Sequence, residues 1–182
     1  MSEVNVTFET TPNPQSMKFT VNQDICNESI FFDDTLKANR SPLANKIFGF
    51  PWASAVFLGT DFVTITKEDW VDWDTLAEPL CGLIQEHFER GEAVLHPEDS
   101  LDDDSNDSPI VKQIKNVLNN EIRPAVAMDG GDIVFHRYEN QIVYIFMQGA
   151  CAGCPSSTLT LKSGIETRMK EAIPEIKEVV AL

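Results

Sequence analysis

The sequence predicts an α+β protein, in which two small domains of mixed α/β structure are joined by an acidic linker. Three observations lead to this fold class. Short stretches that alternate apolar and polar residues, as half-buried strands do, are interspersed with longer stretches of helical apolar periodicity. Residues 92–108 hold seven acidic and no basic residues, which divides the chain. The total of 182 residues is enough for two small domains.

Residues 1–91 are expected to form the N-terminal domain. Thr11-Pro12-Asn13-Pro14 predicts a turn between its first two strands. Ser41 followed by Pro42 is typical of a helix start, since serine caps the helix and proline fits its first turn. Gly91 ends a second, longer helix. The expected strands are 4–9, 17–21, 30–32, 55–58 and 61–66, and the expected helices are 41–48 and 73–90.

Residues 92–108 are expected to be a flexible, solvated linker. Asp102-Asp103-Asp104 lies at its centre, and like charges at this density repel one another. Only Val94, Leu95 and Leu101 in this stretch are bulky and apolar, so it has too little apolar surface to form a core.

Residues 109–182 are expected to form the C-terminal domain, with the element order α-β-β-α-β. A first helix begins at Ser108-Pro109 and is expected to end before Pro124. A turn at Glu139-Asn140 joins two strands, and Pro155 begins the second helix. The expected strands are 132–138, 141–147 and 176–180, and the second helix is 155–172.

The charge balance excludes whole classes of partner. The chain has 14 basic and 29 acidic residues, a net charge of −15, so neither nucleic acid nor an anionic membrane is an expected partner. No apolar run reaches the ~18 residues of a membrane-spanning helix. The first residues show neither a secretory signal nor a transit peptide, so the expected location is cytoplasmic.

The strongest chemical signal is the pair Cys151 and Cys154, separated by two small residues. The pair directly precedes the helix that Pro155 opens, where unpaired amides and the helix dipole favour a thiolate over a thiol. A thiolate is the form that binds a metal. Cys151 and Cys154 are therefore the candidate ligands for a metal ion or an iron–sulfur cluster.

The number of ligands predicts that two copies of the chain share the site. Structural zinc and 4Fe–4S clusters both take about four protein ligands, whereas the C-terminal domain offers two cysteines. His136 lies in a predicted strand and is expected at the surface. Cys26 and Cys81 lie in the other domain without a partner motif. A homodimer, in which two cysteine pairs meet across a two-fold axis, is therefore expected.

The residues alone leave two other functions open. Cys151 and Cys154 could act as the dithiol of a thiol–disulfide oxidoreductase, or hold zinc in a bridged interaction module. The sequence contains no acid–base pair, nucleophile triad or phosphate loop, so an enzyme is not expected. Asp129-Gly130-Gly131-Asp132 is interpreted locally as a turn between helix and strand.

Two long stretches of the chain resemble a known family. The segments Ile122-Arg123-Pro124, Asp129-Gly130-Gly131-Asp132 and 149–166, with 173–176, resemble the NifU C-terminal domain. The segments Thr11-Pro12-Asn13-Pro14 with Lys18-Phe19, 41–44 and 61–67 are similar to the Nfu N-terminal domain. In this order the two domains resemble an Nfu/NifU-like iron–sulfur cluster scaffold or carrier protein.

The resemblance implies a cofactor, partners and a site. It implies a 4Fe–4S cluster that Cys151 and Cys154 bind between two subunits, and delivery of that cluster to apo iron–sulfur proteins. It also implies an upstream cluster assembly scaffold as a partner. The N-terminal domain carries no ligand set, so its expected role is to select client proteins or to support transfer.

Overall fold

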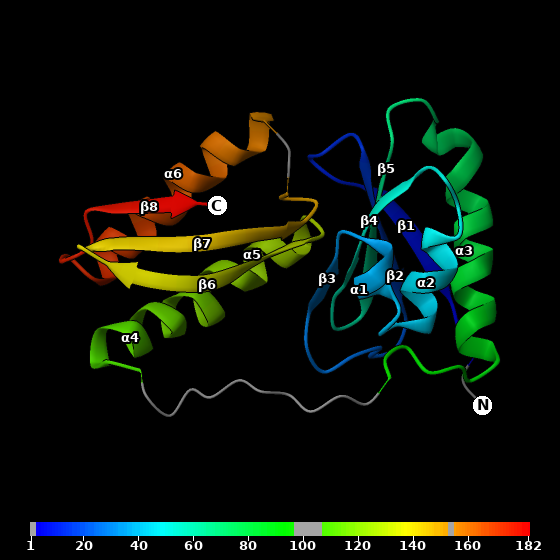
Figure 1. Cartoon of the computed structure of the whole chain (residues 1–182), viewed down its shortest axis with the longest axis horizontal. Helices are drawn as coiled ribbons and strands as arrows, with labels where there is room; N and C mark the ends of the chain where they lie inside the picture. Colours follow the sequence, from blue (N-terminus) through cyan, green and yellow to red (C-terminus); the bar gives the residue numbers. More distant parts are fainter. Residues whose placement is uncertain (1–2, 97–106, 153–154) are drawn as a thin grey trace. The chain divides into compact units, whose positions relative to one another are not determined.

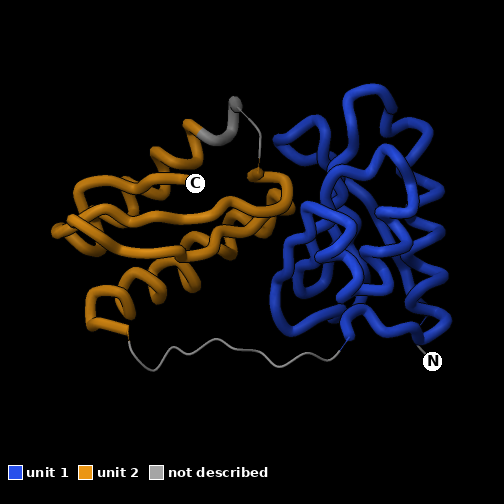
Figure 2. The backbone as a smooth tube through the Cα atoms, viewed as in Figure 1, with its two compact units in different colours: residues 1–97 blue, residues 98–182 orange. Residues whose placement is uncertain are grey.

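The computed structural model describes residues 3–96, 107–152 and 155–182 (Figure 1). The chain divides into two compact units, residues 1–97 and residues 98–182 (Figure 2). Residues 97–106 of the predicted linker lie outside the described residues. None of the helices within the described ranges is long and apolar enough to cross a membrane.

The first unit is an antiparallel sheet with helices packed against it. Its strands follow the spatial order β1-β2-β5-β4-β3. Apolar side chains of the two longer helices, α2 and α3, share one core with the sheet residues Phe19, Val56 and Ile65. The elements are β1 (Val6–Thr10), β2 (Ser16–Val21), β3 (Ile30–Phe32), α1 (Thr35–Ala38), α2 (Pro42–Phe48), β4 (Ala53–Leu58), β5 (Phe62–Lys67) and α3 (Trp73–Glu89).

The capping residues of the first unit lie where the sequence predicts them. The Oγ of Ser41 accepts a hydrogen bond from the amide of Ala44 at 3.1 Å, which satisfies one of the unpaired amides at the start of α2. Gly91 has a φ of +65°, the left-handed conformation that favours glycine just beyond the end of α3. Helix α1 is an additional short element that the apolar periodicity does not predict.

The segment that follows α3 returns to the first unit. Val94 and Leu95 pack against its core, and the amide of His96 donates to the carbonyl oxygen of Arg40 at 2.8 Å. Residues 92–96 are therefore anchored by contacts, although the sequence assigns them to the linker.

The second unit is a three-stranded sheet packed against helices. Its strand order is β6-β7-β8, where β6 and β7 are antiparallel and β7 and β8 are parallel. Ile133, Val143, Ile145 and Val179 from the strands share one core with helical residues such as Met169. The elements are α4 (Pro109–Val117), the π-helical segment η2 (Leu118–Ile122), α5 (Arg123–Met128), β6 (Gly131–Glu139), β7 (Ile142–Gly149), α6 (Pro155–Ala172) and β8 (Glu178–Ala181).

The prediction that the first helix of this unit ends before Pro124 is wrong. The chain remains helical to Met128, because a wide π turn at Leu118–Ile122 separates α4 from α5. Pro124 then lies in the first turn of α5, where a missing backbone N–H is tolerated. The chain does not leave the helix at this proline. It changes from α-helix to π-helix at Leu118 and returns to α-helix at Arg123.

Candidate functional site

Cys151 lies on the turn that leaves β7. Gly149 ends this strand with a φ of +65°, and the amide of Ala152 donates to the carbonyl oxygen of Gly149 at 3.1 Å. The amide of Ala150 donates to the carbonyl oxygen of Gly130 at 3.2 Å. These bonds tie the cysteine turn to the turn that precedes β6, and the Cys151 side chain joins the core of the second unit.

Gly131 lies directly against the sulfur of Cys151. A Cβ atom at position 131 would lie 2.3 Å from the Cys151 Sγ and 2.9 Å from the carbonyl oxygen of Gln148. Both distances are shorter than any normal contact, so only glycine fits while these atoms keep their places. The backbone at position 131 therefore packs closely against the sulfur, and we call this contact between Gly131 and Cys151 the glycine cradle.

Gly130 shapes the same turn from the other side. Its φ of +78° reverses the chain between α5 and β6, and its carbonyl oxygen accepts the bond from Ala150. Gly131 pairs with Gly149 at the first position of the β6–β7 ladder. The two strand ends that carry the glycines therefore meet at the cysteine turn.

An ion pair with a buried carboxylate lies next to this contact. The Asp132 carboxylate accepts hydrogen bonds from Arg123, with 2.7 Å between Nε and Oδ1 and 2.5 Å between Nη2 and Oδ2. The hydrogen bond and the charge of Asp132 raise the pKa of Arg123 above its ordinary value. Asp132 is 4% exposed, and its Oδ1 also accepts from the amide of Ile133 at 2.8 Å. The pair thus joins the start of α5 to the start of β6.

One buried polar atom near the cysteine turn has no partner. The Oε1 of Gln148 makes no hydrogen bond within the part of the chain that the structure describes. Gln148 precedes Cys151 by three positions and pairs with Asp132 across β6 and β7. Unsatisfied buried acceptors are uncommon in folded proteins, which makes this atom an exception among the described residues.

The second predicted ligand lies outside the described residues. Cys154 falls in the undescribed pair 153–154, so the structure gives no distance between the two sulfurs. Helix α6 begins at Pro155, immediately after Cys154. The positive end of its dipole therefore adjoins the motif, as the sequence predicts, and favours thiolates there.

The two remaining described cysteines, Cys26 and Cys81, lie in the first unit. Burial raises the pKa of Cys26 to about 11, and its Sγ donates to the carbonyl oxygen of Gly59. Burial, followed by the charge of Glu78, also raises the pKa of Cys81. Both side chains pack against the core of the first unit.

No group of three or more His, Cys, Asp or Glu side chains within residues 3–96, 107–152 and 155–182 could hold a metal ion. His136 is exposed and stacks near the ring of Phe146, with 4.8 Å between ring centroids, as a surface residue does. The described part of the chain therefore offers Cys151 as a candidate ligand without a complete ligand set around it.

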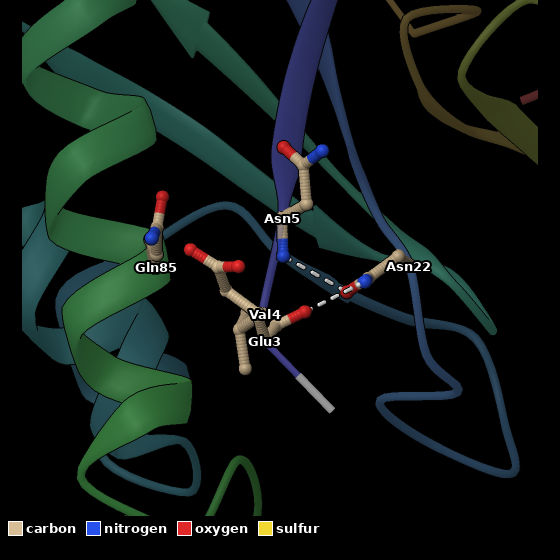
Figure 3. Close-up of a pocket in the computed structure, with 5 residues that line it drawn as sticks. All are labelled: Glu3, Val4, Asn5, Asn22 and Gln85. Atoms are coloured by element: carbon tan, nitrogen blue, oxygen red, sulfur yellow. Dashed lines mark hydrogen bonds between the residues drawn. The ribbon is translucent and has the colours of Figure 1, made fainter. Parts of the chain in front are cut away.

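A surface pocket of about 430 Å³ lies in the first unit, far along the chain from Cys151 and Cys154 (Figure 3). Glu3, Val4, Asn5, Asn22 and Gln85 line it. The side chain of Asn22 bridges the backbone there, because its Oδ1 accepts from the Asn5 amide and its Nδ2 donates to the Glu3 carbonyl oxygen. The pocket contains neutral amides and one carboxylate, and it has no thiol or imidazole ligand.

Sequence reasoning missed the residues that support Cys151. It interpreted Asp129-Gly130-Gly131-Asp132 as a plain turn, whereas Gly131 contacts the sulfur and Asp132 anchors Arg123. The available signal was the pair of adjacent glycines followed by an acid. Local rules explain such glycines by the turn alone. The contact of Gly131 with Cys151, 20 positions away, is visible only in the folded chain.

Comparison with known families finds two matches along the chain. Residues 6–91 match the family described as scaffold protein Nfu/NifU N terminal. Residues 114–180 match the family described as NifU-like domain. The cysteine turn, the glycine cradle and the ion pair all lie within the second match.

Individual relatives are similar over most of the chain. Proteins named NFU1 iron-sulfur cluster scaffold homolog, mitochondrial, are 38% identical in Drosophila persimilis and 40% identical in Drosophila virilis, over 93% of this chain. The alignments cover 62% and 58% of those proteins, so the chain spans about three fifths of their length. A solved NifU-like protein from Saccharomyces cerevisiae is 29% identical, with a TM-score of 0.47 over 52% of this chain and 87% of that chain.

Proposed function

Since the chain belongs to the Nfu/NifU-like family, we propose that it carries an iron–sulfur cluster as cargo and hands it to apo iron–sulfur proteins. The thiolates of Cys151 and Cys154 hold the cluster. The printed names of the relatives, which call them iron–sulfur cluster scaffolds, support this function. The observation that carries it is the cradle in which the Gly131 backbone fits against the Cys151 sulfur.

The cargo is a 4Fe–4S cluster shared between two copies of the chain. Such a cluster takes about four cysteine ligands, and the second unit supplies two. The two other cysteines, Cys26 and Cys81, lie in the first unit without a partner motif. A second copy therefore supplies the missing thiolates, and the loaded form is a homodimer.

Transfer proceeds by ligand exchange and needs no catalytic group. Thiolates of an acceptor replace Cys151 and Cys154 in turn, so the cluster moves without a change in the carrier's covalent structure. An upstream assembly scaffold supplies the cluster by the same exchange. The chain thus works as a carrier rather than as an enzyme.

The two units divide the work between them. The second unit carries the cluster, and the first unit selects clients or supports transfer. Exposed apolar side chains such as Trp70, which is 65% exposed, give the first unit contact points for a client. A fragment of residues 107–182 is therefore expected to bind a cluster but to transfer it more slowly to some acceptors. If the fragment transferred the cluster to every acceptor as fast as the full chain does, the first unit would not select clients.

We place the protein in the cytoplasm. The thiols Cys26 and Cys81 form no disulfide, which suits a reducing compartment. The mitochondrial matrix is also reducing, and the relatives are named mitochondrial. Fractionation of the source cells followed by immunodetection distinguishes the two locations, and recovery in the mitochondrial fraction would overturn the cytoplasmic assignment.

Anaerobic reconstitution with iron and sulfide tests the function. Wild-type protein should bind about four irons and four sulfides per dimer, with a broad visible absorbance. Cys151→Ala and Cys154→Ala should each abolish the absorbance, whereas Cys26→Ala and Cys81→Ala are matched controls that should keep it. Binding of zinc alone would favour the bridged interaction module. Insulin reduction well above background without bound iron would favour the oxidoreductase.

A further inference from the structure

The Arg123–Asp132 pair is more buried than its neighbours in the second unit. The Asp132 side chain is 5% exposed and that of Arg123 is 36% exposed. By comparison, Arg168 and Glu121 form an ion pair at 2.7 Å whose side chains are 59% and 41% exposed. Burial of charge costs free energy, and apolar side chains of similar volume stabilise a core at least as well. This cost falls mainly on the Asp132 carboxylate, because more than a third of the Arg123 side chain remains exposed.

The geometry of the pair is specific. Both carboxylate oxygens of Asp132 accept from the guanidinium of Arg123, which fixes the plane of each group. A third nitrogen, Nη1, donates to Oδ1 of Asn119 at 3.0 Å. Asn119 lies in the π-helical segment η2, and π turns of this kind occur often at functional sites. The guanidinium is thus held from two sides.

The ion pair is linked to Cys151 through Gly131, the residue that precedes Asp132. Asp132 is bonded to Gly131, whose backbone fits against the Cys151 sulfur with no room for a side chain. The carboxylate also accepts from the Ile133 amide, which ties Asp132 to the next residue of β6. A small shift of β6 would move the cradle away from the sulfur.

We propose that Arg123 and Asp132 are positioning residues for the cargo site, and that their ion pair fixes the Gly131 backbone so that Cys151 presents its thiolate to the cluster. This inference rests on the proposed carrier function. It assigns to the pair a role in holding and releasing the cluster, beyond that of stabilising the fold. Outer groups that orient metal ligands typically contribute about tenfold to hundredfold to metal affinity.

The variants Arg123→Gln and Asp132→Asn remove the charges and keep similar shapes. Arg123→Lys keeps the charge but loses the fork, so it should restore part of the effect. Arg168→Gln is the matched control, because it removes an exposed ion pair from the same unit. Each variant is made in the full chain, and thermal unfolding of the apo protein shows whether it is folded.

Two measurements separate positioning from stability. The first is the half-life of the reconstituted cluster against an iron chelator, with the iron–thiolate stretching bands in the resonance Raman spectrum. We expect Arg123→Gln and Asp132→Asn to shorten the half-life about tenfold or more and to shift the bands. The second is amide hydrogen exchange of residues 129–133 and 149–152 in the apo protein, which should become faster in both variants. Arg168→Gln should match the wild type in every measurement.

Each outcome decides the proposal. Folded Arg123→Gln and Asp132→Asn proteins with wild-type half-life, bands and exchange would overturn it. If these two variants fail to fold, Arg123→Lys decides, because a folded Lys variant with wild-type half-life and bands would overturn it equally. A wild-type chain that binds no cluster would instead refute the carrier function, and the positioning role with it, before any variant is compared.

Discussion

The backbone of Gly131 lies against the sulfur of Cys151, so closely that a Cβ at position 131 would be 2.3 Å from Sγ. The contact joins the turn before β6 to the turn after β7, and it links the glycine pair of the sequence to its cysteine motif. A methyl group added at position 131 tests whether the site needs this contact.

Gly131→Ala should disrupt the cysteine turn. The added methyl group meets both the Cys151 sulfur and the Gln148 carbonyl oxygen, and the backbone oxygen cannot move without shifting β7. We expect the apo protein to lose about 1–3 kcal/mol of unfolding free energy, and the reconstituted protein to lose most of its cluster. Denaturant unfolding and iron analysis measure the two effects.

Gly164→Ala is the control for this substitution. Gly164 lies in α6, and a Cβ there would have no neighbour within 4 Å. Alanine favours a helix over glycine, so the variant should gain roughly 0.5–1 kcal/mol and bind the cluster normally. Equal behaviour of the two alanine variants would contradict the cradle.

The stability of the first unit should fall as the pH falls below neutrality. His87 is fully buried, its Nδ1 lies 3.2 Å from the Lys46 ammonium, and its Nε2 lies 3.2 Å from the Ala93 carbonyl oxygen. Burial first, and then the charge of Lys46, lower the pKa of His87 below its ordinary value of 6.5, although Glu92 opposes this. The folded state therefore binds fewer protons than the unfolded chain.

The sign of this effect fixes the pH window. Stability is fully present above pH 6.5, the pKa of His87 in the unfolded chain, and decreases as the pH drops from there towards the lowered folded-state pKa. The pKa of Glu92 is lowered by its bond to Lys46, so its contribution is likewise lost in acid. His87→Gln should flatten the stability profile between about pH 5 and 7.5. The exposed His96→Gln should retain the wild-type slope, and an unchanged slope in His87→Gln would exclude this source.

Ser41→Ala should destabilise the first unit. The Ser41 hydroxyl is buried and accepts from the Ala44 amide, which has no partner inside the helix. Loss of such a cap costs about 1 kcal/mol of unfolding free energy. Ser108 provides the comparison, since it precedes α4 without a side-chain capping bond. Ser108→Ala should therefore change the stability of the second unit by much less, and equal losses would argue against the capping role of Ser41.

Cys26 should resist alkylation at neutral pH. Burial raises its pKa to about 11, so its reactive thiolate is scarce at pH 7. Mass spectrometry of iodoacetamide-treated native protein should find Cys26 largely unmodified at pH 7, with modification increasing towards pH 10. Denatured protein supplies the reference rate. Rapid modification of Cys26 in the folded state at pH 7 would show that burial does not protect it.

Local patterns predicted much of the fold because the forces behind them are local. Ser41 and Pro42 begin α2 through a cap and a fixed φ. The hairpin turn predicted at Glu139-Asn140 forms one residue later, where Asn140 and Gln141 take positive φ. The helix end predicted at Pro124 was wrong, because a proline usually ends a helix. Here the π turn before it places Pro124 in the first turn of a new helix, where proline is tolerated.

The candidate site was predictable only in part. Spacing and the following helix predict Cys151 and Cys154 as ligands, because a cysteine pair before a helix start is a local pattern, and this stays a prediction. The contact of Gly131 with Cys151 and the bond of Arg123 to Asp132 depend on how β6, β7 and α5 pack, and local sequence rules do not reach that far. Each of these residues has an ordinary local explanation, so the sequence offers no reason to connect them.

The central claim is that two chains share one cluster through Cys151 and Cys154. Anaerobic sedimentation velocity of the reconstituted full chain, followed at both the protein and the cluster absorbance, tests it most directly. We expect the cluster absorbance to sediment only with the dimer. We also expect the dimer to return to monomer when a chelator removes the iron, because a cluster that binds only the dimer stabilises the dimer. A monomer that carries a full 4Fe–4S cluster would contradict the claim, because other ligands would then have to complete the site.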